Sequence, residues 1–249
     1  MLSRSLGELY SRPLDPLQEW IPGILPKQAI WLLGGLAKIG KSFLMTEIGF
    51  SLASGAPLFG CWPVVEGPKG VLYIEQENGQ WELQRRIKTR FHSSPPGNYW
   101  YISQAEGMLI DMGGLERIAG EIEALGANIL LLDPASYFLM GDENSNTDVG
   151  RFNRLLRTLI SRSPGLSIIL SHHFGKPPRE YPRGPHHDPN DFLNFRGASK
   201  WGDFANTLTT IHRPEASGIT LLSSWTTRHG ISPGEIDLKL FPWGEVWRA

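Results

Sequence analysis

The sequence predicts an α/β fold with a doubly wound, mostly parallel sheet. Short apolar stretches of strand length, such as residues 29–35, 71–77 and 128–133, alternate with stretches of helical periodicity. Strands that are apolar on both faces belong to parallel sheets covered by helices on both sides. From about Asn206 onward, short strand-like stretches follow one another with turn signals between them. This tail predicts antiparallel hairpins that extend the sheet.

The size of the chain predicts one large domain, or one domain with a small appendage. Its 249 residues are 41% hydrophobic and 20% charged, which is the balance of an ordinary globular protein. We expect residues 1–17 to form an N-terminal extension or arm, and residues 18–249 to form the domain itself.

Charge and cysteine content limit the partners and the compartment. The net charge of −1 provides no global positive field, so any contact with a polyanion has to be local. The single cysteine, Cys61, excludes an intramolecular disulfide and fits a reducing cytosol. The N-terminal stretch does not have the apolar run of a secretion signal, and no stretch of 18 consecutive apolar residues is present. We therefore expect a cytoplasmic protein with no membrane partner.

The segment GLAKIGKS has the spacing of a phosphate-binding loop, in which Gly35 is followed by four residues and then by Gly40, Lys41 and Ser42. It lies between a predicted strand and a predicted helix, the context that this motif requires. Backbone N–H groups and the positive end of the helix dipole would face the phosphates. Lys41 is expected to reach the β- and γ-phosphates of ATP, and the Ser42 hydroxyl to bind Mg²⁺. The predicted nucleotide-binding residues are Gly35, Ala37, Lys38, Ile39, Gly40, Lys41, Ser42 and Phe43.

Carboxylates end two of the predicted strands. Asp133 ends the stretch 128–133, where it would hold Mg²⁺ through water together with Ser42. Glu75 and Glu77 end the stretch before it, where a carboxylate can polarise the water that attacks the γ-phosphate. The residue pattern leaves both glutamates as candidates, with a solvated pair at a strand exit as the alternative.

Two histidines, His172 and His173, follow the predicted strand 166–171. A polar side chain at this place could contact the γ-phosphate and report its presence. The alternative is a pair of ordinary loop histidines.

With these elements in order, the chain resembles the RecA-like ATPase core of hexameric replicative helicases, of the plasmid RepA type and of the C-terminal domain of the DnaB type. The similarity covers roughly residues 18–247. It implies a RecA-like P-loop NTPase domain that binds ATP and Mg²⁺. It also implies that Glu77 is the base, that Asp133 takes the Walker B position and that His172, where the RepA type has histidine, senses the γ-phosphate.

The segment TTRHGISPGEIDLKL, residues 226–240, is similar to the C-terminal Arg-Asn-Gly hairpin of the DnaB type. This likeness implies that Arg228 is an arginine finger that reaches the nucleotide of a neighbouring copy, which requires a homo-oligomer, expected to be a hexameric ring. Two positions depart from the pattern, because Thr226 replaces a lysine of the DnaB type and Asn206 replaces an arginine of the RepA type. Other candidate cations for the subunit interface are therefore Arg196, Lys200 and Arg213.

In the resembled family, loops after the third and fourth strands line a channel for single-stranded DNA. The corresponding Pro-rich stretch, residues 174–195, holds Lys176, Arg179 and Arg183 among aromatic residues. Interleaved cations and aromatics suit a groove that binds the backbone and stacks the bases. A solvated loop with no partner is the alternative.

The leading hypothesis is a Mg²⁺-dependent ATPase that forms a hexameric ring and moves on single-stranded DNA during replication of a plasmid, phage or mobile element. The second is a RecA-fold ATPase of recombination, regulation or defence without helicase activity. A small-molecule kinase is disfavoured by the C-terminal hairpins and by the absence of an Arg-rich lid-like segment. A nucleotide-gated scaffold that does not hydrolyse ATP is the fourth hypothesis.

Overall fold

The computed structural model describes residues 5–90, 94–103, 110–174, 200–212, 220–228, 233–240 and 246–248. The helices are α1 (Leu6–Ser11), α2 (Lys41–Ser54), α3 (Gly79–Arg90), α4 (Met112–Leu125), the 3-10 helix η1 (Ala135–Tyr137), α5 (Asn146–Arg162) and α6 (Lys200–Asp203). The strands are β1 (Glu19–Ile21), β2 (Leu25–Pro26), β3 (Ile30–Gly35), β4 (Val71–Glu75), β5 (Tyr99–Ser103), β6 (Ile129–Asp133), β7 (Ser167–His173), β8 (Thr207–His212), β9 (Thr220–Thr227), β10 (Gly234–Leu240) and β11 (Val246–Arg248).

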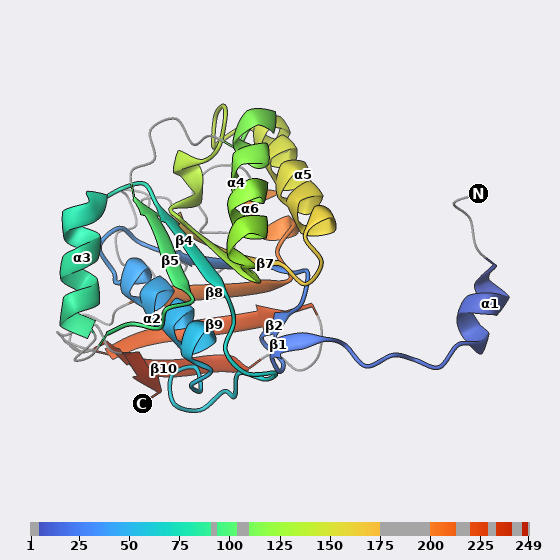
Figure 1. Ribbon diagram of the computed structural model, residues 1–249, viewed down its shortest axis with the longest axis horizontal. Helices are drawn as coiled ribbons and strands as arrows, with labels where there is room; N and C mark the ends of the chain where they lie inside the picture. Colours follow the sequence, from blue (N-terminus) through green and yellow to red (C-terminus); the bar gives the residue numbers. More distant parts are fainter. Residues whose placement is uncertain are drawn as a thin grey trace, which may run out of the picture.

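Nine of the described strands form one sheet in the order β11-β10-β9-β8-β3-β7-β6-β4-β5 (Figure 1). The six strands from β8 to β5 are parallel to one another. Strands β9, β10 and β11 continue the sheet with antiparallel pairing. The predicted α/β fold, with a mostly parallel sheet and antiparallel strands at its C-terminal edge, is confirmed.

Strand β8 differs in one respect from the prediction for the C-terminal tail. It pairs in parallel with β3, from Trp31↔Thr207 to Gly35↔Ile211, and only its other edge is antiparallel to β9. Most of its side chains are buried on both faces, as expected for a strand inside the parallel part of the sheet. The antiparallel extension therefore begins one strand later than the sequence suggested.

The core lies on both faces of the sheet, because successive side chains of a strand point to opposite sides. In β3, Ile30 and Leu32 belong to the apolar cluster that includes residues of α4 and α5. Trp31 and Leu33 belong to the second cluster, which includes residues of α2. Burial of such a side chain contributes about 1.5–3 kcal/mol, so the alternation holds the helices on the two faces and makes the sheet doubly wound.

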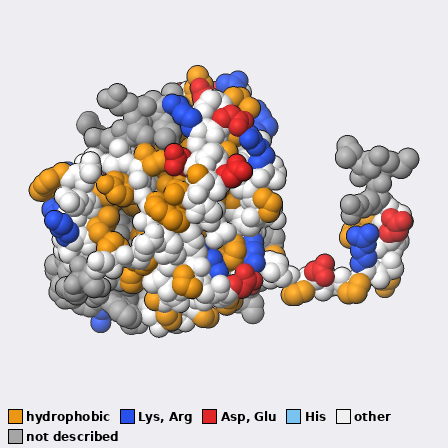
Figure 2. Space-filling view, in the orientation of Figure 1, with side chains coloured by type: hydrophobic (Ala, Val, Ile, Leu, Met, Phe, Trp, Pro, Cys, Tyr) orange, Lys and Arg blue, Asp and Glu red, His pale blue; other side chains and the backbone are white. Residues whose placement is uncertain are grey.

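Helix α1 lies away from the rest of the molecule (Figure 1). The Ser5 hydroxyl caps it by accepting hydrogen bonds from the backbone N–H groups of Gly7 and Glu8, and none of its residues is buried. Apolar side chains of this arm are exposed, among them Leu6 and Tyr10 (Figure 2). Within the described residues, no helix is long and apolar enough to cross a bilayer.

The parallel arrangement brings the carboxyl ends of four strands to one edge of the sheet. In register, Gly35 of β3 pairs with His173 of β7, and Glu75 of β4 pairs with Asp133 of β6. Ligands of open α/β sheets bind at this edge. The residues that the sequence analysis selected at strand ends are therefore neighbours in space.

Candidate nucleotide-binding site

A cavity of about 320 Å³ lies at this edge, between the start of α2 and the strand ends. It is lined by Ala37, Lys38, Gly40, Lys41, Ser42, Phe43, Glu77, Asn78, Arg86, Asp133 and His173. Its volume is within the range of small-molecule sites. Six of the predicted nucleotide-binding residues are part of this lining.

The other two predicted residues of the loop support it from behind. Ile39 packs into the apolar cluster on the α2 face of the sheet. A Cβ atom at Gly35 would lie 2.8 Å from the carbonyl oxygen of Ile211, so the close approach of β8 requires glycine there. Gly40, with a φ of 115°, is in a conformation that favours glycine, and α2 begins at the next residue. The helix N-terminus therefore faces the cavity, the usual arrangement of an anion site.

Lys41 lies across the phosphate loop. Its Nζ donates to the carbonyl oxygens of Gly35, at 3.0 Å, and Leu36, at 2.9 Å, and lies 3.0 Å from Nδ1 of His173. Burial lowers the pKa of Lys41 to about 8, although the negative charges of Asp133 and Glu77 oppose the shift. The cation is thus held where a phosphate would complete its coordination.

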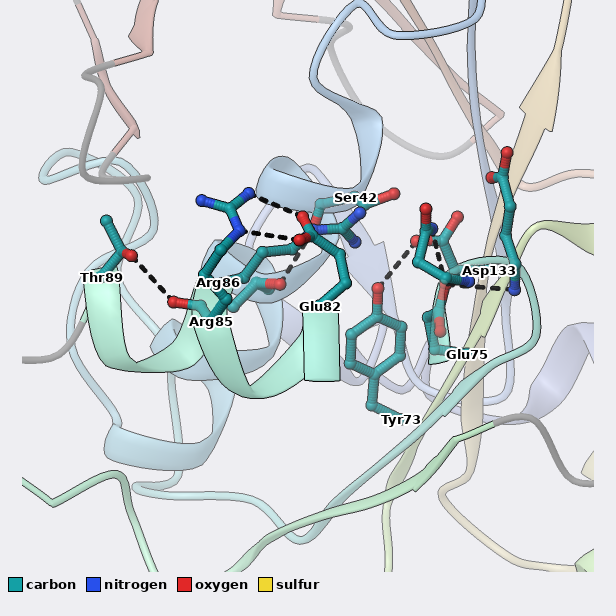
Figure 3. Close-up of polar contacts among 11 residues, drawn as sticks. Ser42, Tyr73, Glu75, Glu82, Arg85, Arg86, Thr89 and Asp133 are labelled. Atoms are coloured by element: carbon teal, nitrogen blue, oxygen red, sulfur yellow. Dashed lines mark hydrogen bonds and ion pairs between the residues drawn. The ribbon is translucent and has the colours of Figure 1, made fainter. Parts of the chain in front are cut away.

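Glu75, which is labelled in Figure 3, and Glu77 have different places in the site. Glu75 is buried, and its Oε1 accepts hydrogen bonds from the backbone N–H groups of Glu77 and Asn78 and from the Asn78 amide. These bonds end β4 and turn the chain so that Glu77 lines the cavity. Burial, followed by the charge of Asp133, raises the pKa of Glu77. Of the two candidate bases, the structure places Glu77 at the cavity and uses Glu75 to build the turn.

Asp133 is 2% exposed at the end of β6. Its Oδ2 accepts a hydrogen bond from the Tyr73 hydroxyl at 2.7 Å, and its Oδ1 accepts one from the Ser171 hydroxyl. Asp133 and Ser42 both line the cavity. The carboxylate and the hydroxyl are the hard oxygen donors that Mg²⁺ prefers, so the residues present fit this ion.

Comparison with known proteins identifies the architecture. The AAA_25 family, described as an AAA domain, matches residues 2–179 of the chain. The chain belongs to this family. Its fold is also similar to that of a KaiC-like protein from the hyperthermophilic archaeon Pyrococcus horikoshii OT3, with 14% identity and a TM-score of 0.60 over 94% of this chain and 100% of the other. No curated protein matches the sequence. The AAA domain therefore has a RecA-like ATPase core, as the resemblance implied.

The structure corrects the position predicted for the histidine of this AAA domain. Strand β7 continues through His172 and His173, so the two side chains point to opposite faces of the sheet. His172 is fully buried and stacks on Trp201, with ring centroids 4.1 Å apart. His173 instead lines the cavity and lies against Lys41. The histidine that lines the cavity is thus His173 and not His172, because the strand extends two residues farther than its apolar pattern.

Arg228 lies at the edge of the sheet opposite the cavity. It follows Thr227, the last residue of β9, which pairs with Thr207. Thr207 in turn pairs with Trp31 near the beginning of β3, whereas the phosphate loop leaves β3 at Gly35. The structure therefore does not bring Arg228 into the cavity of its own chain.

Local contacts hold Arg228 and Asn206 at this opposite edge. The Arg228 guanidinium donates to the carbonyl oxygen of Asp203, and its backbone N–H donates to that of Asn206 at 2.9 Å. The Asn206 Oδ1 accepts hydrogen bonds from the backbone N–H of Ile30 and from the guanidinium of Arg157. Asn206 thus joins β8 to its surroundings at the position where the RepA type carries an arginine.

The remaining predicted cations are only partly within the described residues. Lys200 is exposed at the start of α6, and its backbone N–H donates to Oδ1 of Asn146 at 3.3 Å. The predictions that fall outside the described residues are Lys176, Arg179, Arg183, Arg196 and Arg213.

Arg86 is a cavity residue to which the sequence analysis assigned no role. It is 7% exposed on α3, and its Nε donates to Oε1 of Glu82 at 3.0 Å (Figure 3). Its guanidinium lies 5.7 Å from the centre of the Phe43 ring. Within the described part of the chain, its buried Nη1 has no hydrogen-bond partner. The sequence signal for Arg86 is its position four residues after Glu82, the spacing of an ion pair on one face of a helix. The polar composition of α3 gave no indication that this face is buried.

Proposed function

We propose that this AAA domain hydrolyses ATP with Mg²⁺. The observation that supports the proposal is the arrangement of Lys41, Ser42, Asp133 and Glu77 around one cavity at the carboxyl edge of the sheet. Backbone N–H groups at the start of α2, together with Lys41, would bind the phosphates. Mg²⁺, held by Ser42 and Asp133, would neutralise charge on the β- and γ-phosphates.

Glu77 would orient the attacking water. Its side chain is exposed at the cavity, where desolvation and the charge of Asp133 raise its pKa, and the raised pKa makes it a better proton acceptor than a free glutamate. Asn78, the next residue, also lines the cavity, and its side-chain amide is fixed by Glu75. His173 would contact the γ-phosphate from the end of β7.

We further propose that the site is completed by a second copy, in a ring that is expected to be hexameric. The position of Arg228 supports this, because an exposed guanidinium at the edge opposite its own cavity is accessible to a neighbour. A guanidinium supplied in this way stabilises charge on the transferring phosphoryl group and can increase the rate by about 10³- to 10⁵-fold.

Single-stranded DNA is the proposed track, and replication of a plasmid, phage or mobile element is the proposed role. The support is the similarity to hexameric helicases along the chain, together with the cations Lys176, Arg179 and Arg183. Six copies of this cation-bearing sequence around a channel would provide enough phosphate contacts for salt-dependent binding.

The test of the composite site is ATP turnover measured against protein concentration. We expect turnover to rise steeply with concentration, and Lys41→Ala and Arg228→Ala each to abolish it. A mixture of the two inactive variants should recover part of the rate, because some interfaces then pair an intact Lys41 with an intact Arg228. Arg162→Ala, which removes an exposed arginine whose partner among the described residues is Glu116 on the surface, is the matched control and should turn over as the wild type. Full activity at high dilution would contradict the composite site.

The test of the DNA role combines ATP turnover with strand displacement. We expect single-stranded DNA to stimulate turnover and a forked duplex to be unwound, and substitution of Lys176, Arg179 and Arg183 by Ala to weaken DNA binding and its salt dependence. Stimulation without displacement would instead indicate a RecA-fold ATPase of recombination, regulation or defence.

A further inference from the structure

Two hydroxyl groups hold the Asp133 carboxylate from opposite sides. They come from the strands that flank β6, since the order in this part of the sheet is β7-β6-β4. Tyr73 of β4 donates to Oδ2, and Ser171 of β7 donates to Oδ1. Figure 3 shows the Tyr73 hydroxyl pointing at Asp133. Each oxygen of the carboxylate therefore has one donor from the protein.

Tyr73 is otherwise an apolar core residue. Its ring is 1% exposed and belongs to the apolar cluster on the α2 face of the sheet. Its hydroxyl donates to Oδ2 of Asp133 at 2.7 Å. A phenylalanine would fill the same volume, so the specific contribution of tyrosine is the bond to Asp133.

Ser171 has the same character on the other side. It is fully buried, and β7 is apolar at the preceding residues Ile168, Ile169 and Leu170. A buried hydroxyl without a partner is unfavourable, and here the partner is the carboxylate. The hydroxyl groups of Tyr73 and Ser171 are thus buried where each can donate a hydrogen bond to Asp133.

The physical consequence is a fixed carboxylate plane. The terminal torsion of an aspartate is broad, so a carboxylate with one donor or none can rotate. Donors on both oxygens prevent this rotation and leave further lone pairs to face the cavity. Groups that orient a metal-binding side chain in this way commonly account for about ten- to a hundredfold in metal affinity.

We propose that Tyr73 and Ser171 are positioning residues that fix Asp133 for the metal–nucleotide complex. This inference rests on the proposed function, because it assigns the pair a role at the same site. It concerns metal affinity, and it distinguishes the pair from buried hydroxyl groups that only support the fold.

Tyr99 provides a matched control. Tyr99 and Tyr73 both line a second cavity, of about 360 Å³, and Tyr99 is a partly buried tyrosine that packs against the same apolar cluster as Tyr73. Its hydroxyl donates to the carbonyl oxygen of Thr46 at 3.4 Å and has no hydrogen bond to Asp133. Tyr99→Phe therefore removes a comparable hydroxyl without touching the carboxylate.

The experiment measures metal binding directly, with the full chain. Mn²⁺, which is visible by electron paramagnetic resonance, is titrated into the protein with saturating ADP. ADP binding is measured separately in EDTA.

We expect Tyr73→Phe and Ser171→Ala each to weaken Mn²⁺ binding by about tenfold or more, with ADP affinity in EDTA within about twofold of the wild type. Tyr99→Phe should bind Mn²⁺ as the wild type does. Thermal unfolding of each variant shows that the fold is retained.

The outcomes separate the two levels of the proposal. If Tyr73→Phe and Ser171→Ala fold and bind Mn²⁺ with wild-type affinity, the positioning role is wrong and the proposed ATPase is unaffected. If Tyr99→Phe weakens Mn²⁺ binding as strongly as Tyr73→Phe does, the effect is one of core packing, and the positioning role is again wrong. If the wild type with ADP binds no Mn²⁺ at all, the proposed function fails together with the inference.

Discussion

Glu75 and Glu77 acquire different roles from their surroundings although they are two residues apart. Glu75 accepts three hydrogen bonds within its own turn. Glu77 is presented to the cavity, where burial and Asp133 raise its pKa. The turn that Glu75 organises therefore determines which carboxylate faces the cavity.

Glu77→Gln tests the role of the base. The substitution keeps the shape of the side chain but removes its capacity to accept a proton. We expect ATP turnover to fall by about 10²- to 10⁴-fold, with ADP affinity within about twofold. Single-turnover hydrolysis and equilibrium ADP binding measure the two quantities. A nucleotide-gated scaffold would instead show no change in turnover, since its wild type would have none.

The lowered pKa of Lys41 predicts a pH dependence for nucleotide binding. Below about pH 8 the ammonium is protonated and attracts the phosphates, whereas above this pH it loses its proton. The phosphates of ADP are already ionised there, because their last pKa is about 6. We expect the Kd for ADP in EDTA to be nearly constant up to about pH 7, to be roughly doubled near pH 8 and then to rise by up to about tenfold per pH unit. Lys41→Arg, which stays charged, should remove this rise, and a rise that persists in the variant would assign it to another group.

At the scale of the element, the alternation of side chains at the end of β7 determines which histidine lines the cavity. The strand includes His172 and His173, and alternation sends one toward Trp201 and the other toward Lys41. The same rule explains the two apolar clusters on the faces of β3. A shift of the strand end by one residue would not change these faces, because alternation continues from the buried part of the strand.

Substitution of the two histidines should separate folding from activity. We expect His172→Ala to lower the free energy of unfolding by about 1–3 kcal/mol, because it removes a buried ring that stacks on Trp201. His173→Ala should change it by less than about 1 kcal/mol but reduce ATP turnover by roughly 10²-fold, the effect of losing one polar group that contacts the reacting phosphate. Urea denaturation and turnover assays check both. The reverse pattern would show that His172 is the sensor after all.

The periodicity of apolar residues was enough to predict most helices and strands. It was least informative at strand ends that consist of polar residues. The apolar runs located β3, β4, β6 and β7, and the Gly-Lys-Ser sequence located the start of α2. The histidines at the end of β7 carry no apolar signal, so their inclusion in the strand depended on pairing with β3. Arg86 could not be assigned from α3 alone, because its place in the cavity depends on how α3 packs, and its guanidinium lies over the ring of Phe43 in α2.

At the scale of the whole molecule, the sheet separates the cavity from the C-terminal arginine. Parallel strands gather the phosphate loop, Asp133 and His173 at one edge, and β8–β9 pairing returns the chain to the other edge at Arg228. Sequence order alone did not reveal this separation, because it depends on β8 pairing in parallel with β3. The separation is the observation on which the proposed composite site of two copies rests.

The N-terminal arm gives the last prediction at this scale. None of the residues of α1 is buried, so we expect removal of residues 1–17 to change the free energy of unfolding of the domain by less than about 1 kcal/mol. Trp20→Ala is the contrasting variant, because Trp20 is buried and its indole N–H donates to the carbonyl oxygen of Gly165. Two lysine ammonium groups also make cation–π contacts with its ring. Its loss should cost about 3–5 kcal/mol. Urea denaturation at low protein concentration compares the two. If the truncation destabilises the protein as much as Trp20→Ala does, the arm is part of the domain and the boundary near residue 18 is wrong.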